Sequence, residues 1–250
     1  MRIGIVQTRP EKGNVAANLA DHQQWASAAV EGGVDLLVFP ELSLTGYEPL
    51  LAKGLATIPE DERFAGLQRM SDRYGMYICA GAPIKREEGV LIGMIIFRPD
   101  DSRLLYAKQY LHADELPYFV PGKEQVFLSL DDHKIALAIC YELGVPDHSA
   151  NAYSHRATVY LASVAKTAEG VEKAMDILSG IACTYSMTVL MVNAVGPCED
   201  GICGGGSAVI SDKGDLLAAL DDVEGGMLIY DTVTGLTDVR KAKAGEEAGI

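Results

Sequence analysis

Short apolar runs recur along the chain, separated by polar or turn-forming residues. Runs of this kind, roughly four to eight residues long and bounded by turn signals, are typical of buried strands. The pattern predicts at least eight strands. They lie at residues 3–7, 35–39, 77–80, 91–97, 134–140, 158–164, 188–192 and 207–211.

Three segments instead place apolar residues at helical spacing. Asn14 is a suitable N-cap for a helix that runs through Val30 and is ended by the Gly32-Gly33 pair. Two further stripes are predicted to face the core. One consists of Phe64, Leu67, Met70 and Tyr74, and the other of Val171, Ala174, Met175, Leu178, Ile181, Ala182 and Tyr185.

The connections between strands predict how the elements are arranged. Residues 98–101 and 131–134 are short polar turns, which favour antiparallel hairpins over helical crossovers. Hairpins together with intervening helices predict an α/β fold with mixed sheets inside and helices outside. No repeat or linker divides the chain, so residues 1–250 are predicted to form one domain. A polar tail from about Arg240 is expected to fray or to reach a neighbouring subunit.

Composition narrows the class of protein. Of the 250 residues 48% are hydrophobic, enough for a large core, and the net charge of −14 disfavours nucleic acid and membrane partners. We see no export signal and no run of about 18 apolar residues. The five cysteines are an odd number without the spacing of a secreted domain, which favours reduced thiols in the cytoplasm.

Three of the apolar strands end abruptly in residues capable of chemistry. Glu41 follows residues 35–40, Cys140 closes residues 135–140, and Lys108 follows Leu104 to Ala107. In α/β proteins such strand ends are where active sites gather. Each residue also has a structural interpretation, namely a capping carboxylate, an inert core thiol and a solvated lysine.

A fourth candidate lies in the loop after Lys108. Glu115 is followed by Pro121-Gly122, and a tight turn there brings Glu115 back toward Lys108. His112 lies nearby, and we interpret it as a loop residue because no histidine is required for thiol chemistry of this kind.

The order and spacing of these residues resemble the nitrilase superfamily of carbon–nitrogen hydrolases. Phe39 to Leu42 with Thr45-Gly46-Tyr47 resembles its glutamate motif, and Ala138 to Glu142 its nucleophile motif. The lysine motif corresponds to Lys108 to Leu111 with Glu115, Phe119, Pro121 and Gly122. The similarity extends to segments at residues 3–7, 192–196 and 205–210.

The resemblance implies a four-layer α-β-β-α sandwich whose subunits pair into a homodimer or a larger even-numbered oligomer. It also implies that Cys140 attacks the carbonyl carbon of a small amide, while Glu41 moves the protons. Lys108, with the backbone N–H of Tyr141, would hold the oxyanion and favour the Cys140 thiolate, and Glu115 would orient the substrate nitrogen or hold Lys108. We expect neither cofactor nor metal. The expected substrate-binding residues are Tyr47, Phe119, Tyr141 and Lys166.

Departures from the family pattern leave the substrate open. Residues 143–147 lack the arginine that members commonly carry after the cysteine, which disfavours N-carbamoyl amino acids. Lys166 offers a cation to a carboxylate-bearing amide, although a solvated lysine is the simpler interpretation. We therefore expect an amidase for short aliphatic or ω-carboxyl amides, with nitriles poorer.

Other functions remain as alternatives. A nitrile hydrolase or an acyltransferase would share this constellation, and a silent small-molecule-binding subunit would retain it without turnover. A papain-like protease is disfavoured because the histidines lie in polar stretches and its cysteine signature is absent. Residues 201–206 are Gly-rich but precede a strand, so we interpret them as a turn or pocket-side loop. Cys198 and Cys203 within or beside it lack the partners of a zinc set.

Overall fold

The computed structural model describes residues 1–199 and 201–241 of the chain. These residues form five α-helices, two short 3₁₀ helices and fifteen strands. In chain order they are β1 (Arg2–Gln7), α1 (Val15–Glu31), β2 (Leu36–Val38), α2 (Pro49–Leu55), η1 (Glu62–Phe64), α3 (Ala65–Tyr74), β3 (Tyr77–Lys85), β4 (Val90–Phe97), β5 (Leu104–Ala107), β6 (Phe127–Leu130), β7 (His133–Ile139), η2 (Cys140–Gly144), α4 (Pro146–Ser154), β8 (Val159–Ser163), α5 (Ala168–Tyr185), β9 (Thr188–Val192), β10 (Val195–Cys198), β11 (Gly201–Gly204), β12 (Ala208–Ile210), β13 (Leu216–Ala219), β14 (Gly226–Asp231) and β15 (Thr237–Lys241).

Two mixed sheets form the centre of the molecule. The seven-stranded sheet has the order β15-β14-β1-β2-β3-β4-β5, and the six-stranded sheet has the order β13-β12-β9-β8-β7-β6. Strands β1, β2 and β3 run parallel, as do β7, β8 and β9, whereas the pairs β4–β5 and β6–β7 are antiparallel. The predicted mixed sheets and both predicted hairpins are therefore confirmed.

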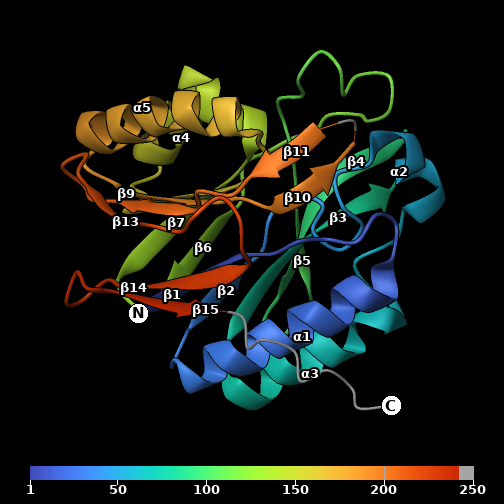
Figure 1. The fold of residues 1–250 in the computed structure, drawn as a ribbon, viewed down its shortest axis with the longest axis horizontal. Coiled ribbons are helices and arrows are strands. Elements are labelled where there is room, and N and C mark those ends of the chain that lie inside the picture. The colour runs from blue at the N-terminus through green and yellow to red at the C-terminus, as the bar shows by residue number, and fades with distance from the viewer. Residues whose placement is uncertain (200, 242–250) are drawn as a thin grey trace.

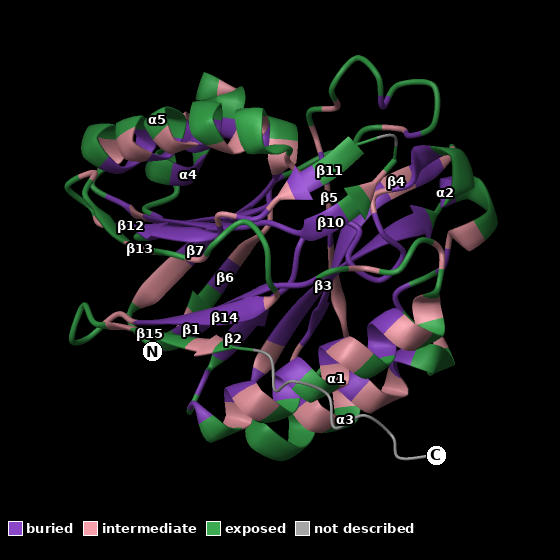
Figure 2. Cartoon of the chain, viewed as in Figure 1, coloured by how far each residue is buried: buried purple, intermediate pink, exposed green. Residues whose placement is uncertain are grey.

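The sheets pack face to face, with helices on both outer sides (Figure 1). Helices α1 and α3 cover the seven-stranded sheet, and α4 and α5 cover the six-stranded sheet. Figure 2 shows the resulting pattern of burial, in which the strands are mostly buried and the helices expose their outer faces. The predicted α-β-β-α sandwich is confirmed.

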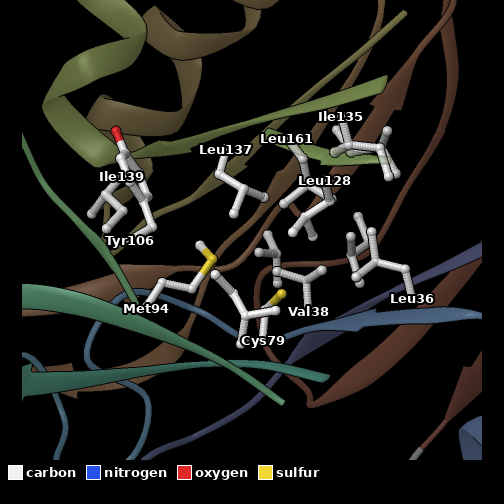
Figure 3. Packing of buried hydrophobic residues seen from close by; sticks show 14 of the residues in the cluster. Leu36, Val38, Cys79, Met94, Tyr106, Leu128, Ile135, Leu137, Ile139 and Leu161 are labelled. Atoms are coloured by element: carbon white, nitrogen blue, oxygen red, sulfur yellow. The ribbon is translucent and has the colours of Figure 1, made fainter. Parts of the chain in front are cut away.

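Apolar side chains from the inner faces of both sheets fill the space between them (Figure 3). Leu36 and Val38 of β2 belong to this core, as do Ile135 and Leu137 of β7. Cys79 is also part of it, and burial raises the pKa of its thiol, as expected for an inert core cysteine. Burial at roughly 25 cal/mol per Å² makes this layer the main source of cohesion between the sheets.

The helices begin and end largely where the sequence predicts. The Asn14 side chain accepts from the Ala17 N–H at 3.2 Å at the start of α1, which stops at Glu31 before Gly32. In the second predicted stripe Phe64 and Leu67 are buried and Met70 is partly buried against the core, but Tyr74 is 47% exposed and does not face the core as predicted. Helices α2 and α4 were not predicted, because each is short and begins at a proline without a long apolar stripe.

Two further predictions concern the periphery. Arg240 belongs to β15, while the remainder of the predicted tail, residues 242–250, lies outside the described residues. Within the part of the chain that the structure describes, no helix combines the length and the apolar character needed to cross a membrane.

Candidate active site

The carboxyl ends of the parallel strands of both sheets meet at one edge of the sandwich. Glu41 follows β2, while Cys140 and Lys166 follow β7 and β8. The Ser163 hydroxyl at the end of β8 donates to the Phe39 carbonyl at 2.9 Å and so ties this edge of one sheet to the other. Reactive and charged side chains from distant parts of the sequence therefore lie close together at this edge.

A tight approach to β3 holds the segment that carries Glu41. A Cβ on Gly81 would collide with the backbone nitrogen of Leu42, so only glycine lets this segment lie against the strand. The Leu44 N–H donates to the Gly81 carbonyl at 2.9 Å. The Glu41 side chain is fully shielded from solvent as a result.

Lys108 lies between two carboxylates. Its Nζ is 2.8 Å from Oε1 of Glu41 and 2.6 Å from Oε1 of Glu115. The Gly122 N–H donates to the Lys108 carbonyl at 2.7 Å, and a Cβ at Gly122 would collide with the Ala107 carbonyl. The predicted return of Glu115 to Lys108 is therefore confirmed, but the turn that produces it lies at residues 113–118, and the predicted turn at Pro121-Gly122 is wrong.

The Glu115 carboxylate is held by further donors. The Tyr47 hydroxyl donates to its Oε1 at 2.9 Å, and the His112 backbone N–H donates to its Oε2 at 2.8 Å. With Lys108 it therefore accepts three hydrogen bonds, which fixes its orientation.

Cys140 stands at the turn from β7 into η2. Its φ of 45° lies in the left-handed region, which is unusual for a residue other than glycine and is characteristic of functional turns. The thiol is partly buried and lies beside the Glu41 carboxylate. Oε2 of Glu41 has no other hydrogen-bond partner of regular geometry within the described residues, so an acceptor is available next to the thiol.

The buried charges shift one another's pKa values. Burial raises the pKa of Glu41, Lys108 lowers it, and the negative charge of Glu115 raises it again, with a net rise. Burial alone would lower the pKa of Lys108, but the neighbouring negative charges of Glu41, Cys140 and Glu115 raise it, so Lys108 stays protonated.

The Cys140 thiol has a pKa of about 11, raised by burial and by Glu41 against the lowering effects of Lys108 and Lys166. Lys108 thus favours the thiolate, as predicted, but burial outweighs it. At neutral pH Cys140 is a thiol, and its nucleophilic form requires a neighbouring base.

These residues open into a cavity of about 610 Å³. Tyr47, Lys108, Cys140, Tyr141 and Lys166 line it, as does Glu115, whereas Glu41 lies buried behind them. The structure does not place Phe119 at the cavity, because its side chain is 3% exposed and packs in the core between the sheets. The other lining residues are His112, Asp114, Ala165, Thr167, Gly170, Cys198, Glu199 and Gly201.

Sequence reasoning missed part of this lining. His112 lies in a loop as predicted, but it also lines the cavity, where its ring contacts Tyr141 with ring centroids 5.2 Å apart and its Nδ1 lies 2.6 Å from Asp114. The Gly-rich residues 201–204 lie beside the cavity, as one of the two predicted alternatives has it, but they form strand β11, paired with β10, rather than a loop. Within residues 1–199 and 201–241 no cluster of three His, Cys, Asp or Glu side chains is arranged to hold a metal.

Comparison with known proteins identifies the family. The carbon–nitrogen hydrolase family model matches residues 2–241. The chain therefore belongs to the carbon–nitrogen hydrolases, the nitrilase superfamily predicted from its motifs, and its fold is that of the amidase-like members.

Several amidases are similar over most of their length. The NitN amidase from Nesterenkonia sp. AN1 superimposes with a TM-score of 0.83 and 26% identity, covering 92% of each chain. A variant of that amidase carries acrylamide added to its active-site cysteine, and it superimposes with a TM-score of 0.84 at 25% identity over 92% of each chain. An (R)-stereoselective amidase from a Pseudomonas species is 26% identical over 89% of this chain and 82% of its own.

Two other relatives differ in length or substrate. A 2-oxoglutaramate amidase from Bacillus subtilis is 27% identical over 74% of this chain and 73% of its own. A glutamine-dependent NAD(+) synthetase from Thermotoga maritima is 27% identical over 87% of this chain, but the match spans only 39% of the synthetase.

Proposed function

We propose that this protein hydrolyses the carbon–nitrogen bond of a small non-peptide amide through a thioester on Cys140. The observation that carries the proposal is the buried Glu41–Lys108–Glu115 group, with the Cys140 thiol beside the Glu41 carboxylate at the base of an open cavity. A nucleophile, a base and a cation are thereby supplied within one site.

In the first half-reaction Glu41 takes the Cys140 proton as sulfur attacks the carbonyl carbon. The raised pKa of Glu41 suits this role, because it narrows the gap to the pKa of about 11 of the thiol. Glu41 then gives the proton to the leaving nitrogen, the C–N bond breaks, and ammonia or an amine departs.

The negative charge that develops on the carbonyl oxygen needs preorganised donors. We assign this role to the Lys108 ammonium and the backbone N–H of Tyr141, each placed next to Cys140 at the cavity wall. One such donor is typically worth about 3 kcal/mol of transition-state stabilisation. Glu115, which holds Lys108 and lines the cavity, would orient the substrate nitrogen.

In the second half-reaction water replaces the leaving group. Glu41 removes a proton from water, hydroxide attacks the thioester carbonyl, and the C–S bond breaks with return of the proton to sulfur. The products are a carboxylic acid and the free Cys140 thiol. An amine in place of water would make the same thioester the intermediate of an acyltransferase.

For the substrate we propose a short aliphatic amide or an ω-carboxyl amide. Lys166 lines the cavity and is close enough to lower the pKa of Cys140. Its ammonium group could therefore form an ion pair with a carboxylate at the far end of the substrate. The similarity to a 2-oxoglutaramate amidase supports a substrate that bears a carboxylate. The similar amidase from Nesterenkonia sp. AN1 has been crystallised with butyramide, which supports a short aliphatic amide. Leu143 and Gly144 stand where carbamoylase-like relatives carry arginine.

We also propose a homodimer or a larger even-numbered homo-oligomer in the cytoplasm. The family resemblance supports the assembly, and the five unpaired cysteines are compatible with a reducing compartment. Light scattering at micromolar concentration tests the assembly, and a monomer would contradict it.

Cys140→Ala tests the function. The variant removes the sulfur but little buried volume, so we expect loss of turnover with an unchanged circular dichroism spectrum, and wild-type protein mixed with a good amide should show the mass of one acyl group on the Cys140 peptide. The matched control is Cys183→Ala, at an exposed thiol outside the cavity. Full activity of Cys140→Ala would exclude the mechanism, and binding without turnover by the wild type would favour a silent subunit.

A further inference from the structure

Two residues beyond the nucleophile, Glu142 is a wholly buried carboxylate that the proposed mechanism does not use. Its Oε2 accepts from the Ile139 N–H at 2.7 Å and from the Tyr106 hydroxyl at 2.5 Å. Its Oε1 accepts from the N–H groups of Gln109 at 2.5 Å and Tyr110 at 3.3 Å. Four donors thus converge on one side chain.

These donors belong to two separate parts of the active site. Ile139 is the last residue of β7 in the six-stranded sheet and directly precedes Cys140. Gln109 and Tyr110 directly follow Lys108, which comes just after β5 in the seven-stranded sheet. Glu142 therefore joins the backbone beside the nucleophile to the backbone beside the lysine, across the gap between the sheets.

This link is important because Cys140 and Lys108 follow strands of different sheets, so no shared strand fixes the distance between them. Electrostatic stabilisation of an oxyanion depends on donors held within a fraction of an ångström of their place. A carboxylate suits this bridge because both its oxygens are acceptors and all four contacting groups donate. A glutamine at this position would turn its NH₂ group toward one of the two pairs of donors, and the two hydrogen bonds of that pair would be lost.

We propose that Glu142 is a positioning residue that fixes Lys108 relative to Cys140. The inference rests on the proposed function, since the assignment of Lys108 to the oxyanion belongs to it. Glu142 does not touch the cavity, so its effect is carried entirely by the two backbone segments that it holds.

The polar side chains around Glu142 are themselves buried. His148 has its Nε2 2.9 Å from the Tyr106 hydroxyl and 3.5 Å from Oε2 of Glu142, while its Nδ1 lies 2.6 Å from the Tyr160 hydroxyl. Burial raises the pKa of Glu142 to about 7, even though the hydrogen bonds from Tyr106, Ile139 and Gln109 and the charge of Lys108 lower it. The four donors thus favour the acceptor-only carboxylate, against the opposing effect of burial.

Glu142→Gln is the test, with kcat and KM measured on the best amide of a panel. A displaced Lys108 weakens the transition state more than substrate binding, so we expect kcat to fall by about 100-fold while KM changes by less than about threefold. Leu67→Ala, in α3 on the outer face of the other sheet, is the control for lost stability alone. If Glu142→Gln does not fold, Glu142→Asp is used, because its shorter side chain keeps the charge but cannot span both segments.

A second readout does not depend on amide hydrolysis. The rate at which methyl methanethiosulfonate modifies Cys140 is followed against pH by peptide mass spectrometry. Glu41, Lys108 and Lys166 are the charged groups that act on this thiol. Because Lys108 lowers the Cys140 pKa, its displacement in Glu142→Gln is expected to move the profile to higher pH, while Leu67→Ala leaves the profile in place.

Each outcome decides the proposal. An unshifted Cys140 profile in a folded Glu142 variant would overturn it, as would a wild-type kcat or a loss of kcat matched by Leu67→Ala at equal melting temperature. A wild-type protein that hydrolyses no amide would contradict the proposed function alone, because the shift of the Cys140 profile still tests the bridge.

Discussion

Nζ of Lys108 lies 2.8 Å from Oε1 of Glu41, and neither side chain has any exposed surface. A second carboxylate, that of Glu115, lies 2.6 Å from the same nitrogen, so one cation is shared by two anions. The excess negative charge and the burial together explain why the pKa of Glu41 is raised despite its ion pair. A carboxylate of this kind is a stronger base than an exposed glutamate, which is what the proposed proton transfer from Cys140 needs.

The first prediction concerns Glu41 as the base. Glu41→Gln keeps an oxygen that accepts from Lys108 but removes the proton acceptor, so kcat should fall by roughly 10²- to 10⁴-fold. In the wild type, kcat/KM should decline as pH falls through the Glu41 pKa, which lies above the ordinary carboxyl value of 4.5. Steady-state kinetics between pH 4 and 9 would show both effects, and an acid limb retained unchanged in the variant would assign it to another group.

The second prediction separates the two carboxylates. The charge of Glu115 raises the pKa of Glu41, so Glu115→Gln should move the acid limb of the kcat/KM profile to lower pH while reducing kcat. Tyr47→Phe removes one donor to Glu115 and leaves its charge, so it is the matched control and should leave the limb in place. A limb that moves to higher pH in Glu115→Gln would contradict the charge assignment.

The positions of the candidate site residues could be predicted because each of three residues follows an apolar strand. Glu41, Lys108 and Cys140 follow β2, β5 and β7, and the carboxyl ends of such strands meet at one edge. Phe119 shows the limit of this reasoning, since membership of a motif did not distinguish a core side chain from a cavity side chain. Only packing between the sheets decides that.

Residues that depend on contacts distant in sequence could not be predicted. Glu142 was recognised as part of a motif, but its partner Gln109 lies 33 positions away, on the far side of the loop that holds Glu115. The same limit applied to His112 and Glu199, which reach the cavity from loops without periodicity. Strand β11 escaped prediction because glycine lowers strand propensity while its pairing with β10 overrides it.

The third prediction concerns stability and His22, which lies beneath the Glu41 segment. Its Nε2 is 2.9 Å from the Ser43 hydroxyl, its Nδ1 is 2.6 Å from the Asn18 carbonyl, and its ring stacks on Phe39 at 3.8 Å. Burial lowers the pKa of His22 to about 3 from 6.5. Its contribution to the free energy of unfolding is therefore complete above pH 6.5 and is lost as pH falls from 6.5 toward 3.

Urea unfolding of the wild type and His22→Gln measures this contribution. We expect the difference in free energy of unfolding to shrink by about 2 kcal/mol between pH 7 and pH 5, because each unit below the unfolded pKa costs about 1.4 kcal/mol. His155→Gln, at an exposed histidine, is the control. A difference that does not change with pH would show that His22 is not held neutral by the fold.

The last prediction concerns Lys166 and the substrate. Lys166→Met keeps the length of the side chain and removes the charge, so kcat/KM for an ω-carboxyl amide should fall by about 10- to 100-fold, the value of a charged contact of roughly 1.5–3 kcal/mol. Butyramide, which has no carboxylate, should change by less than about threefold.

Lys173→Met, at an exposed lysine on α5, controls for loss of net charge. Equal losses on both amides would remove Lys166 from substrate recognition and leave the short aliphatic class. Because no arginine follows the nucleophile motif in residues 143–147, N-carbamoyl amino acids should be poor substrates. If one of them were hydrolysed at least about a hundredfold faster than any simple amide, a gap of about 2.7 kcal/mol in transition-state binding, the proposed substrate class would be wrong.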